Sequence, residues 1–416
     1  MALLKISASA QYHENLPLRK AAAITLEKNI KFAWNEIREI LSGPSVIFSE
    51  NAKQLLRDNL LNAIMDANHP NIIKLLCSGL QQILARDFPT KWPTFEQQVI
   101  DLLKSNPGPE KIYALLSGYG SLTKMRQYYV NEDRKQITES NQVILPIFEE
   151  LVQALIQNYT EINALLIKRV LSIYHKVTRM DLDDYTRQIE INDKWMSYCH
   201  FVLTYSNPIF ETKAPENIIE RENLNKSPFW KAKKTALDVI KKYSMRYGIP
   251  EDETKENEGF SSHWAEKWGL VFSNICTQFI SCHNNGLYVP PFVLCLSCSY
   301  LTRITKSKII RDKLLPELET IIFQYVLPLL YFRKEDQEQF EDNPVEYIRK
   351  NDDNIIKFDL KGEANQIISR YANHKNPATG KNFLYNILFF CNKFLSDGQN
   401  PRNPEEKLTV ISKEAI

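Results

Sequence analysis

The stretch that decides the fold is PNIIKLLCSGLQQILARDFPTKWPTFEQQVIDLLK, residues 70–104. Both of its halves carry apolar residues at helical spacing: Ile73, Leu76, Leu80 and Ile83, then Phe95, Val99, Leu102 and Leu103. Between them, Pro89 and Pro93 flank Trp92. Because proline ends a helix and is tolerated at the start of the next, the stretch predicts two helices joined by a tight corner, with Trp92 packed beneath the turn.

The same pattern fills the rest of the chain, and strand-like alternation never persists. Helices are expected at 16–34, 50–65, 71–87, 93–104, 110–129, 142–158, 161–178, 188–204, 229–247, 260–282, 291–306, 310–332, 354–373 and 379–396. Opening helices recur at intervals of roughly 40 to 70 residues, and the shorter intervals match the HEAT period. Because one helix pair cannot bury its apolar face alone, the sequence predicts an all-α HEAT-repeat solenoid, a right-handed superhelix of about eight helix pairs.

The composition excludes several functions. Only 12 of 416 residues are glycine, and neither GxGxxG nor GxxxxGK[ST] occurs, so dinucleotide and P-loop nucleotide binding are not supported. The net charge of +2 is unlike that of a nucleic-acid-binding domain. The seven histidines are dispersed, and HExxH and GxSxG are absent. We therefore expect no enzyme activity, no catalytic residues and no cofactor.

One cluster resembles a metal site, because Cys295 and Cys298 have a spacing that zinc could use, and Cys276, Cys282 and His283 lie nearby in the sequence. The pair falls in the middle of an apolar helix, whereas structural zinc ligands usually lie on turns. We interpret the thiols as buried free cysteines and expect no bound metal. A zinc-dependent enzyme that uses this cluster remains the alternative, which metal analysis of the purified protein would test.

The chain contains one long uncharged stretch and several charged runs. The stretch 269–302 has no Asp, Glu, Lys or Arg, but polar residues and Pro290-Pro291 divide it into pieces too short to span a membrane.

The lysines of 230–234 and 241–242 are expected on the solvated face of an amphipathic helix. Asp87 is expected to accept backbone N–H groups of the following helix. Glu149-Glu150 and Asp183-Asp184 are expected on exposed faces or in turns.

The corner Asp87-Phe-Pro-Thr-Lys-Trp92-Pro93 resembles the D-[FY]-P-x-x-W-P string of the importin-β (karyopherin-β) family of nuclear transport receptors. Three further segments are similar to family strings: 16–34, beginning Leu-Pro-Leu-Arg; 227–237, around Trp230; and Glu341-Asp-Asn-Pro-Val-Glu-Tyr-Ile-Arg349. The last two resemble the importin-seven/importin-eight branch. The family motif residues in this chain are Asp87, Pro89, Trp92, Pro93 and Trp230.

The resemblance implies that the chain corresponds to the N-terminal portion of such a receptor. It divides the sequence into 1–15, the second half of a truncated first repeat; 16–205, early repeats with a Ran-binding-like region; 206–228, a linker or insert; 229–400, further repeats with inserts near 250–259 and 333–353; and 401–416, the start of a truncated repeat.

The resemblance also implies the function. The chain is expected to bind protein cargo and the GTP-bound form of the small GTPase Ran on the inner face of the solenoid, and phenylalanine-glycine (FG) repeats of nucleoporins on the outer face. Expected cargoes include basic proteins such as ribosomal proteins or histones. Neither direct nucleic-acid contact nor membrane insertion is expected. We expect the chain to be a monomer. We expect it in the cytoplasm, in the nucleus and at the nuclear pore. The alternatives are a helical-repeat scaffold of phosphatase or vesicle-coat type, and an exportin of the same family.

Helical-wheel geometry assigns candidate residues to these surfaces. Residues opposite the apolar centre of each second helix should face the inner side. The candidates for Ran and cargo contact are Gln54, Asp58, Gln97, Asp101, Lys104, Glu149 and Gln153. Phe292 and Leu296, beside the 229–247 helix, are the candidates for an FG-repeat pocket.

Overall fold

A computed structural model describes residues 1–12, 14–34, 48–126, 134–179, 182–252, 259–331, 334–345, 359–375 and 380–397. Helices joined by turns and short irregular segments make up these ranges, and the isolated bridges Lys213–Leu287 and Lys375–Asn382 are the β-type pairings recorded there. None of the described helices combines the length and apolar character that a membrane span needs. The predicted all-α fold is confirmed. Two compact units are present, Met1–Trp195 and Met196–Ile416.

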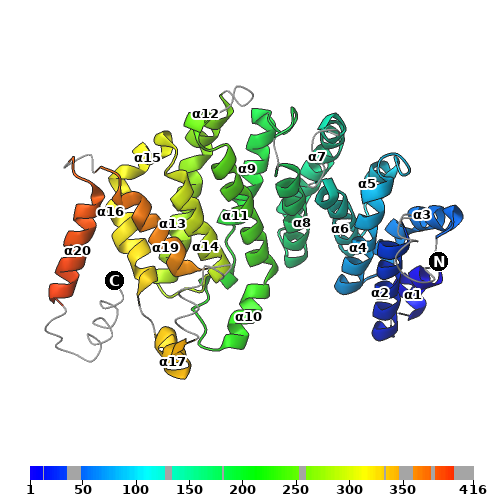
Figure 1. Ribbon diagram of the computed structural model, residues 1–416, viewed down its shortest axis with the longest axis horizontal. Helices are drawn as coiled ribbons and strands as arrows, with labels where there is room; N and C mark the ends of the chain where they lie inside the picture. The colour runs from blue at the N-terminus through cyan, green and yellow to red at the C-terminus, as the bar shows by residue number, and fades with distance from the viewer. Residues whose placement is uncertain are drawn as a thin grey trace. The chain divides into compact units, whose positions relative to one another are not determined.

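The first unit contains two rows of helices, which we call first and second helices by their order within each repeat. The first helices are α2 (Leu16–Ala33), α4 (Pro70–Asp87), α6 (Pro109–Arg126) and α8 (Glu161–Val177), and each packs on the next (Figure 1). The second helices are α1 (Ala2–Ala8), α3 (Glu50–Asp66), α5 (Phe95–Lys104) and α7 (Arg134–Gln157). The rows interlock, since α3 packs on both α4 and α6 and α5 packs on α6. This is the stacking that a helical repeat needs to bury its apolar faces.

Local signals set the helix ends. Asn15, Ser49 and Thr160 accept backbone N–H groups as N-caps of α2, α3 and α8. Leu18 of α2 is 41% exposed. Its neighbour Arg19 is buried instead, because its guanidinium donates to the carbonyl oxygens of Ser7 and Ala67.

The second unit continues the pattern with more irregular helices. Its helices are α10 (Ile218–Lys226), α11 (Pro228–Arg246), α12 (Phe260–Trp264), α13 (Leu270–Asn284), α14 (Pro291–Ile304), α15 (Lys308–Leu314), α16 (Leu318–Thr320), α17 (Lys334–Asp342), α19 (Leu360–Ala372) and α20 (Phe383–Asp397). Helix α9 (Ile189–Thr204) contains the boundary between the units. Within the second unit α11 packs on α14, and α14 packs on α19.

Two details differ from the predicted helices of this unit. The single helix expected at 310–332 is divided into α15, α16, a π-helical turn at Ile321–Val326 and two 3-10 turns, which contain Pro316 and Pro328. Helix α10, which was not among the predicted helices, lies within 206–228, the expected linker or insert. The family-like segment that ends at Arg349 lies partly outside the described residues.

The expected solvated lysine face of α11 is wrong at two positions. Lys233 and Lys242 are buried. The Lys233 ammonium donates to the carbonyl oxygens of Leu203, at 2.5 Å, and Tyr205, at 3.1 Å. It also lies 4.2 Å from the ring centroid of Phe210. Burial lowers the pKa of Lys233 to about 7.

Three of the four clustered cysteines are buried, as predicted. Cys276, Cys295 and Cys298 are buried free thiols, and Cys282 is half-buried. Burial raises the pKa of Cys276 and of Cys295 to about 12, so both stay protonated and resemble small apolar side chains. Within the described part of the chain, no group of three or more His, Cys, Asp or Glu side chains could hold a metal ion.

Candidate protein-binding surface

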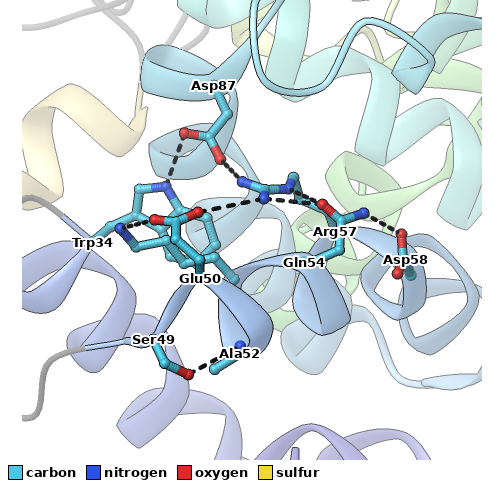
Figure 2. Close-up of polar contacts among 9 residues, drawn as sticks. Trp34, Ser49, Glu50, Ala52, Gln54, Arg57, Asp58 and Asp87 are labelled. Carbon is cyan, nitrogen blue, oxygen red and sulfur yellow. Dashed lines mark hydrogen bonds and ion pairs between the residues drawn. The ribbon is translucent and has the colours of Figure 1, made fainter.

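The corner between α4 and α5 is held by the buried carboxylate of Asp87. This carboxylate accepts a hydrogen bond from Arg57 Nη1 at 2.6 Å and another from Trp34 Nε1 at 3.1 Å (Figure 2). The expectation that it would accept backbone N–H groups of α5 is wrong. Instead, the Asp87 carbonyl oxygen accepts from the backbone N–H groups of Lys91 and Trp92 and closes the turn. Asp87 therefore ties α4 to α3 and to the end of α2.

The other motif residues support this corner. Trp92 is buried and meets Phe95 edge to face, with 5.1 Å between ring centroids. Its packing beneath the turn confirms the prediction. Pro89 is half-buried and Pro93 is exposed. In the second unit, Trp230 is buried against Phe210, with ring centroids 4.7 Å apart.

A chain of hydrogen bonds leads from buried Arg57 to the exposed face of α3. Arg57 Nε and Nη2 donate to Gln54 Oε1 at 3.2 Å and 3.0 Å. The Gln54 amide in turn donates to Asp58 Oδ1 at 2.8 Å (Figure 2). Because the guanidinium fixes which way the amide points, the exposed carboxylate of Asp58 is held in a defined orientation. At the start of α3, a hydrogen bond from Lys53 lowers the pKa of Glu50.

The same side-chain pair recurs on α5. Gln97 Nε2 donates to Asp101 Oδ1 at 2.6 Å, and both residues are exposed. The interval from Gln54 to Gln97 equals that from Asp58 to Asp101, 43 residues, which falls within the HEAT period. The two pairs therefore occupy equivalent positions in successive repeats. Lys104, also exposed, lies at the end of α5.

On α7 the structure separates the two predicted residues. Gln153 is exposed, but Glu149 is only 5% exposed, so its assignment to an open face is wrong. Glu149 Oε2 lies 3.3 Å from Lys194 Nζ of α9. Burial, together with the negative charges of Glu149 and Asp183, raises the pKa of Tyr185 to about 12. Glu149 therefore joins α7 to α9.

The exposed members of the predicted set form what we call the second-helix surface: Gln54, Asp58, Gln97, Asp101, Lys104 and Gln153. These side chains present amides, carboxylates and one ammonium, which suit hydrogen bonds and ion pairs with another protein. Sequence reasoning missed Arg57, which orients part of this surface. Its signal is weak, because an arginine on the apolar side of a helix gives no hint of a partner 30 residues away.

The proposed FG-repeat pocket is not open in the structure. Helices α11 and α14 pack together as expected. However, Leu296 is buried at 5% exposure and Phe292 is half-buried, so Leu296 belongs to the core. Exposed apolar side chains gather instead on α20, in a run of sequence that was not singled out: Leu384, Tyr385, Leu388 and Phe389.

Comparison with known proteins gives the family. The model of the importin-beta N-terminal domain matches residues 1–66, and the Cse1 family model matches residues 130–354, more than half of the chain. Human importin-8 is 26% identical over 96% of this chain and 38% of that protein. Exportin-2 of Dictyostelium discoideum is 25% identical over 80% of this chain and 33% of that protein. The chain thus spans less than two-fifths of the length of these relatives.

Solved structures agree on the fold. The exportin Cse1 in its cargo-free, cytoplasmic state has a TM-score of 0.73 at 19% identity, covering 99% of this chain and 42% of that one. Lph2, a bidirectional nuclear transport receptor of S. cerevisiae, has a TM-score of 0.60 at 13% identity, covering 99% and 41%. The predicted helical-repeat fold and the family resemblance are both confirmed. The chain belongs to the importin-β family, whose members are transport receptors and not enzymes.

Proposed function

We propose that this chain is part of a nuclear transport receptor that binds Ran-GTP and protein cargo through the second-helix surface. The observation that carries the proposal is the repeated Gln–Asp pair, which places oriented carboxylates at equivalent positions on α3 and α5. Asp58 and Asp101 are exposed, so they favour a partner or cargo with a basic surface. The proposed receptor also binds FG nucleoporins. It would therefore move between the cytoplasm and the nucleus through the nuclear pore.

Binding of Ran tests the proposal. The chain is immobilised and titrated with Ran that carries a non-hydrolysable GTP analogue, and separately with Ran-GDP. We expect binding of the GTP form only, and we expect Asp58→Lys combined with Asp101→Lys to weaken it by about tenfold or more, since like charges across an interface repel. Glu14→Lys, at an exposed carboxylate outside the second helices, is the matched control.

Two results would count against the proposal. Equal retention of Ran-GTP and Ran-GDP would favour a scaffold of another complex. If the double variant and the Glu14→Lys control bound Ran-GTP equally well, the second-helix surface would not be the contact.

Export is the second candidate, because the match to the Cse1 family model covers 130–354 and a protein named importin alpha re-exporter, from Saccharomyces cerevisiae, is 24% identical over 95% of the chain. The sign of the coupling between ligands separates the two directions. In import, Ran-GTP weakens cargo binding, and in export it strengthens it, by the same factor that cargo changes Ran binding. Capture of importin α only when Ran-GTP is present would support export. Release of a basic ribosomal protein on addition of Ran-GTP would support import.

A further inference from the structure

Two cations of α8 lie against α6 along the row of first helices. Lys176 Nζ donates to the carbonyl oxygen of Gly120 at 3.2 Å. Two turns earlier, the Arg169 guanidinium donates to Tyr113 Oη and lies over its ring, with 4.6 Å from Cζ to the centroid. Both contacts join residues 56 positions apart, so α6 and α8 run side by side in the same direction. We call this line of contact, with Lys124 at its end, the basic seam.

The positive charge of the basic seam is not neutralised by the described part of the chain. None of Lys124, Arg169 and Lys176 forms an ion pair there. Arg169 Nε is buried without a hydrogen-bond partner. Burial, followed by the charges of Arg169 and Lys124, lowers the pKa of Lys176 to about 8. Arg169 and Lys176 are half-buried and Lys124 is exposed, so an anion bound here would relieve the repulsion that Lys176 experiences in a partly desolvated position.

The neighbouring groups leave the cations available to a ligand. Cys77 of α4 is the other titratable group that acts on Lys176, and burial raises the pKa of its thiol to about 12, so it carries no charge near neutral pH. Gly120 has no side chain, and a Cβ placed there would lie 3.6 Å from Lys176 Nζ. The ammonium therefore contacts the backbone of α6 directly, and Gly120 is its one hydrogen-bond acceptor among the described residues.

We propose that the basic seam binds the phosphate group of a phosphorylated protein segment. A phosphate monoester carries a charge of about −1.5 to −2 near neutral pH, which matches a site with several unpaired cations better than one carboxylate does. The paired N–H groups of an arginine guanidinium match the oxygens of a phosphate, and a lysine ammonium adds a positive charge beside the guanidinium. A nucleic acid strand repeats its phosphates and needs a long track of cations, and the net charge of the whole chain is only +2.

The test uses the full chain and a fluorescent nine-residue peptide of glycine and serine with one central phosphoserine. We expect the phosphopeptide to bind at least about tenfold more tightly than its unphosphorylated form, because charge-assisted hydrogen bonds of the seam are lost without the phosphate. Arg169→Gln and Lys176→Gln should each weaken binding by a similar factor. Lys28→Gln, at an exposed lysine of first helix α2, is the matched control and should bind as the unchanged chain does. Circular dichroism shows that each variant is folded.

A pH series adds an independent readout. Because the pKa of Lys176 lies at about 8, affinity should fall between pH 7 and pH 9 as the ammonium loses its proton, and Lys176→Gln should remove most of that fall. Equal binding of the two peptides would overturn the proposal, as would equal affinities of Arg169→Gln, Lys176→Gln and Lys28→Gln. Tighter binding of a nine-nucleotide RNA or of vesicles with phosphoinositide would overturn the assignment to a phosphorylated protein segment.

Discussion

Replacing Asp87 by asparagine is the sharpest test of how the α4–α5 corner is held. Asparagine has nearly the same shape, and its oxygen can still accept from Trp34 Nε1. Its NH2 group, however, would face the donors of Arg57 in place of the carboxylate oxygen that now lies 2.6 Å from Nη1. The substitution therefore leaves a guanidinium buried without its counter-charge.

The expected magnitude follows from burial. The side chains of Arg57 and Asp87 are 6% and 4% exposed, so water cannot replace the lost partner. Breaking such a pair by removing one member costs about 3–5 kcal/mol. We expect the lower end of that range, because Arg57 keeps its hydrogen bonds to Gln54 and its Nη2 lies 3.9 Å from Glu50 Oε2. A loss of about 3 kcal/mol corresponds to roughly a hundredfold change in an opening equilibrium.

Hydrogen exchange is the suitable assay, because helical repeats open locally and a single global transition is not assured. Amides of α3 and α4 should exchange about a hundredfold faster in Asp87→Asn. Asp66→Asn is the control, since its pair with Lys111 spans 3.7 Å and both side chains are about half exposed, so it should change the opening free energy by less than about 1 kcal/mol. Exchange in α3 and α4 within about threefold of the unchanged protein would refute the reasoning.

Three other predictions concern the second unit. Burial lowers the pKa of Lys233 to about 7, below the ~10.4 of an exposed lysine. The free energy of unfolding should therefore rise between pH 7 and pH 10, and Lys233→Met should make the thermal midpoint less dependent on pH over that range. Gly269→Ala would place a Cβ in steric conflict with Ile310 Cδ1 and should lower the free energy of urea unfolding by about 1–3 kcal/mol. Adding Ile310→Val should restore part of the loss, and no recovery would contradict this contact. Leu296→Ala should cost about 2–5 kcal/mol and Phe292→Ala less, whereas equal small losses would mean that Leu296 is not in the core.

The features predicted from the sequence are those that neighbouring residues decide. The corner in 70–104 follows from proline and apolar spacing over a few turns, and both helices and the packing of Trp92 were predicted. The helix at 310–332 shows the limit of this approach. Its apolar spacing is helical, but Pro316 and Pro328 each remove a backbone donor, and the run divides into short helical pieces.

The wrong predictions for polar side chains have a different cause, because each of these side chains has a partner that is distant in the sequence. Glu149 was expected to be exposed, yet its partner Lys194 lies 45 residues away. Lys233 was expected in solvent, yet it reaches carbonyl oxygens 30 and 28 residues away. A long side chain on an amphipathic helix looks solvated until the fold brings an acceptor to it. Pattern reasoning therefore locates the second-helix surface but cannot show what orients it.

Two buried arginines each join neighbouring helices, and the cations of the basic seam differ from them. Arg19 joins α2 to the carbonyl oxygens of Ser7 and Ala67, and Arg57 joins α3 to the carboxylate of Asp87. In each case an acceptor from another helix satisfies the cation, so the bond fixes how neighbouring helices stack. Among the described residues, Arg169 donates only to a phenol oxygen, and Lys176 donates to one carbonyl oxygen while two like charges lie near it. A cation pair that stacking alone does not satisfy is better suited to an external anion than to holding α6 against α8.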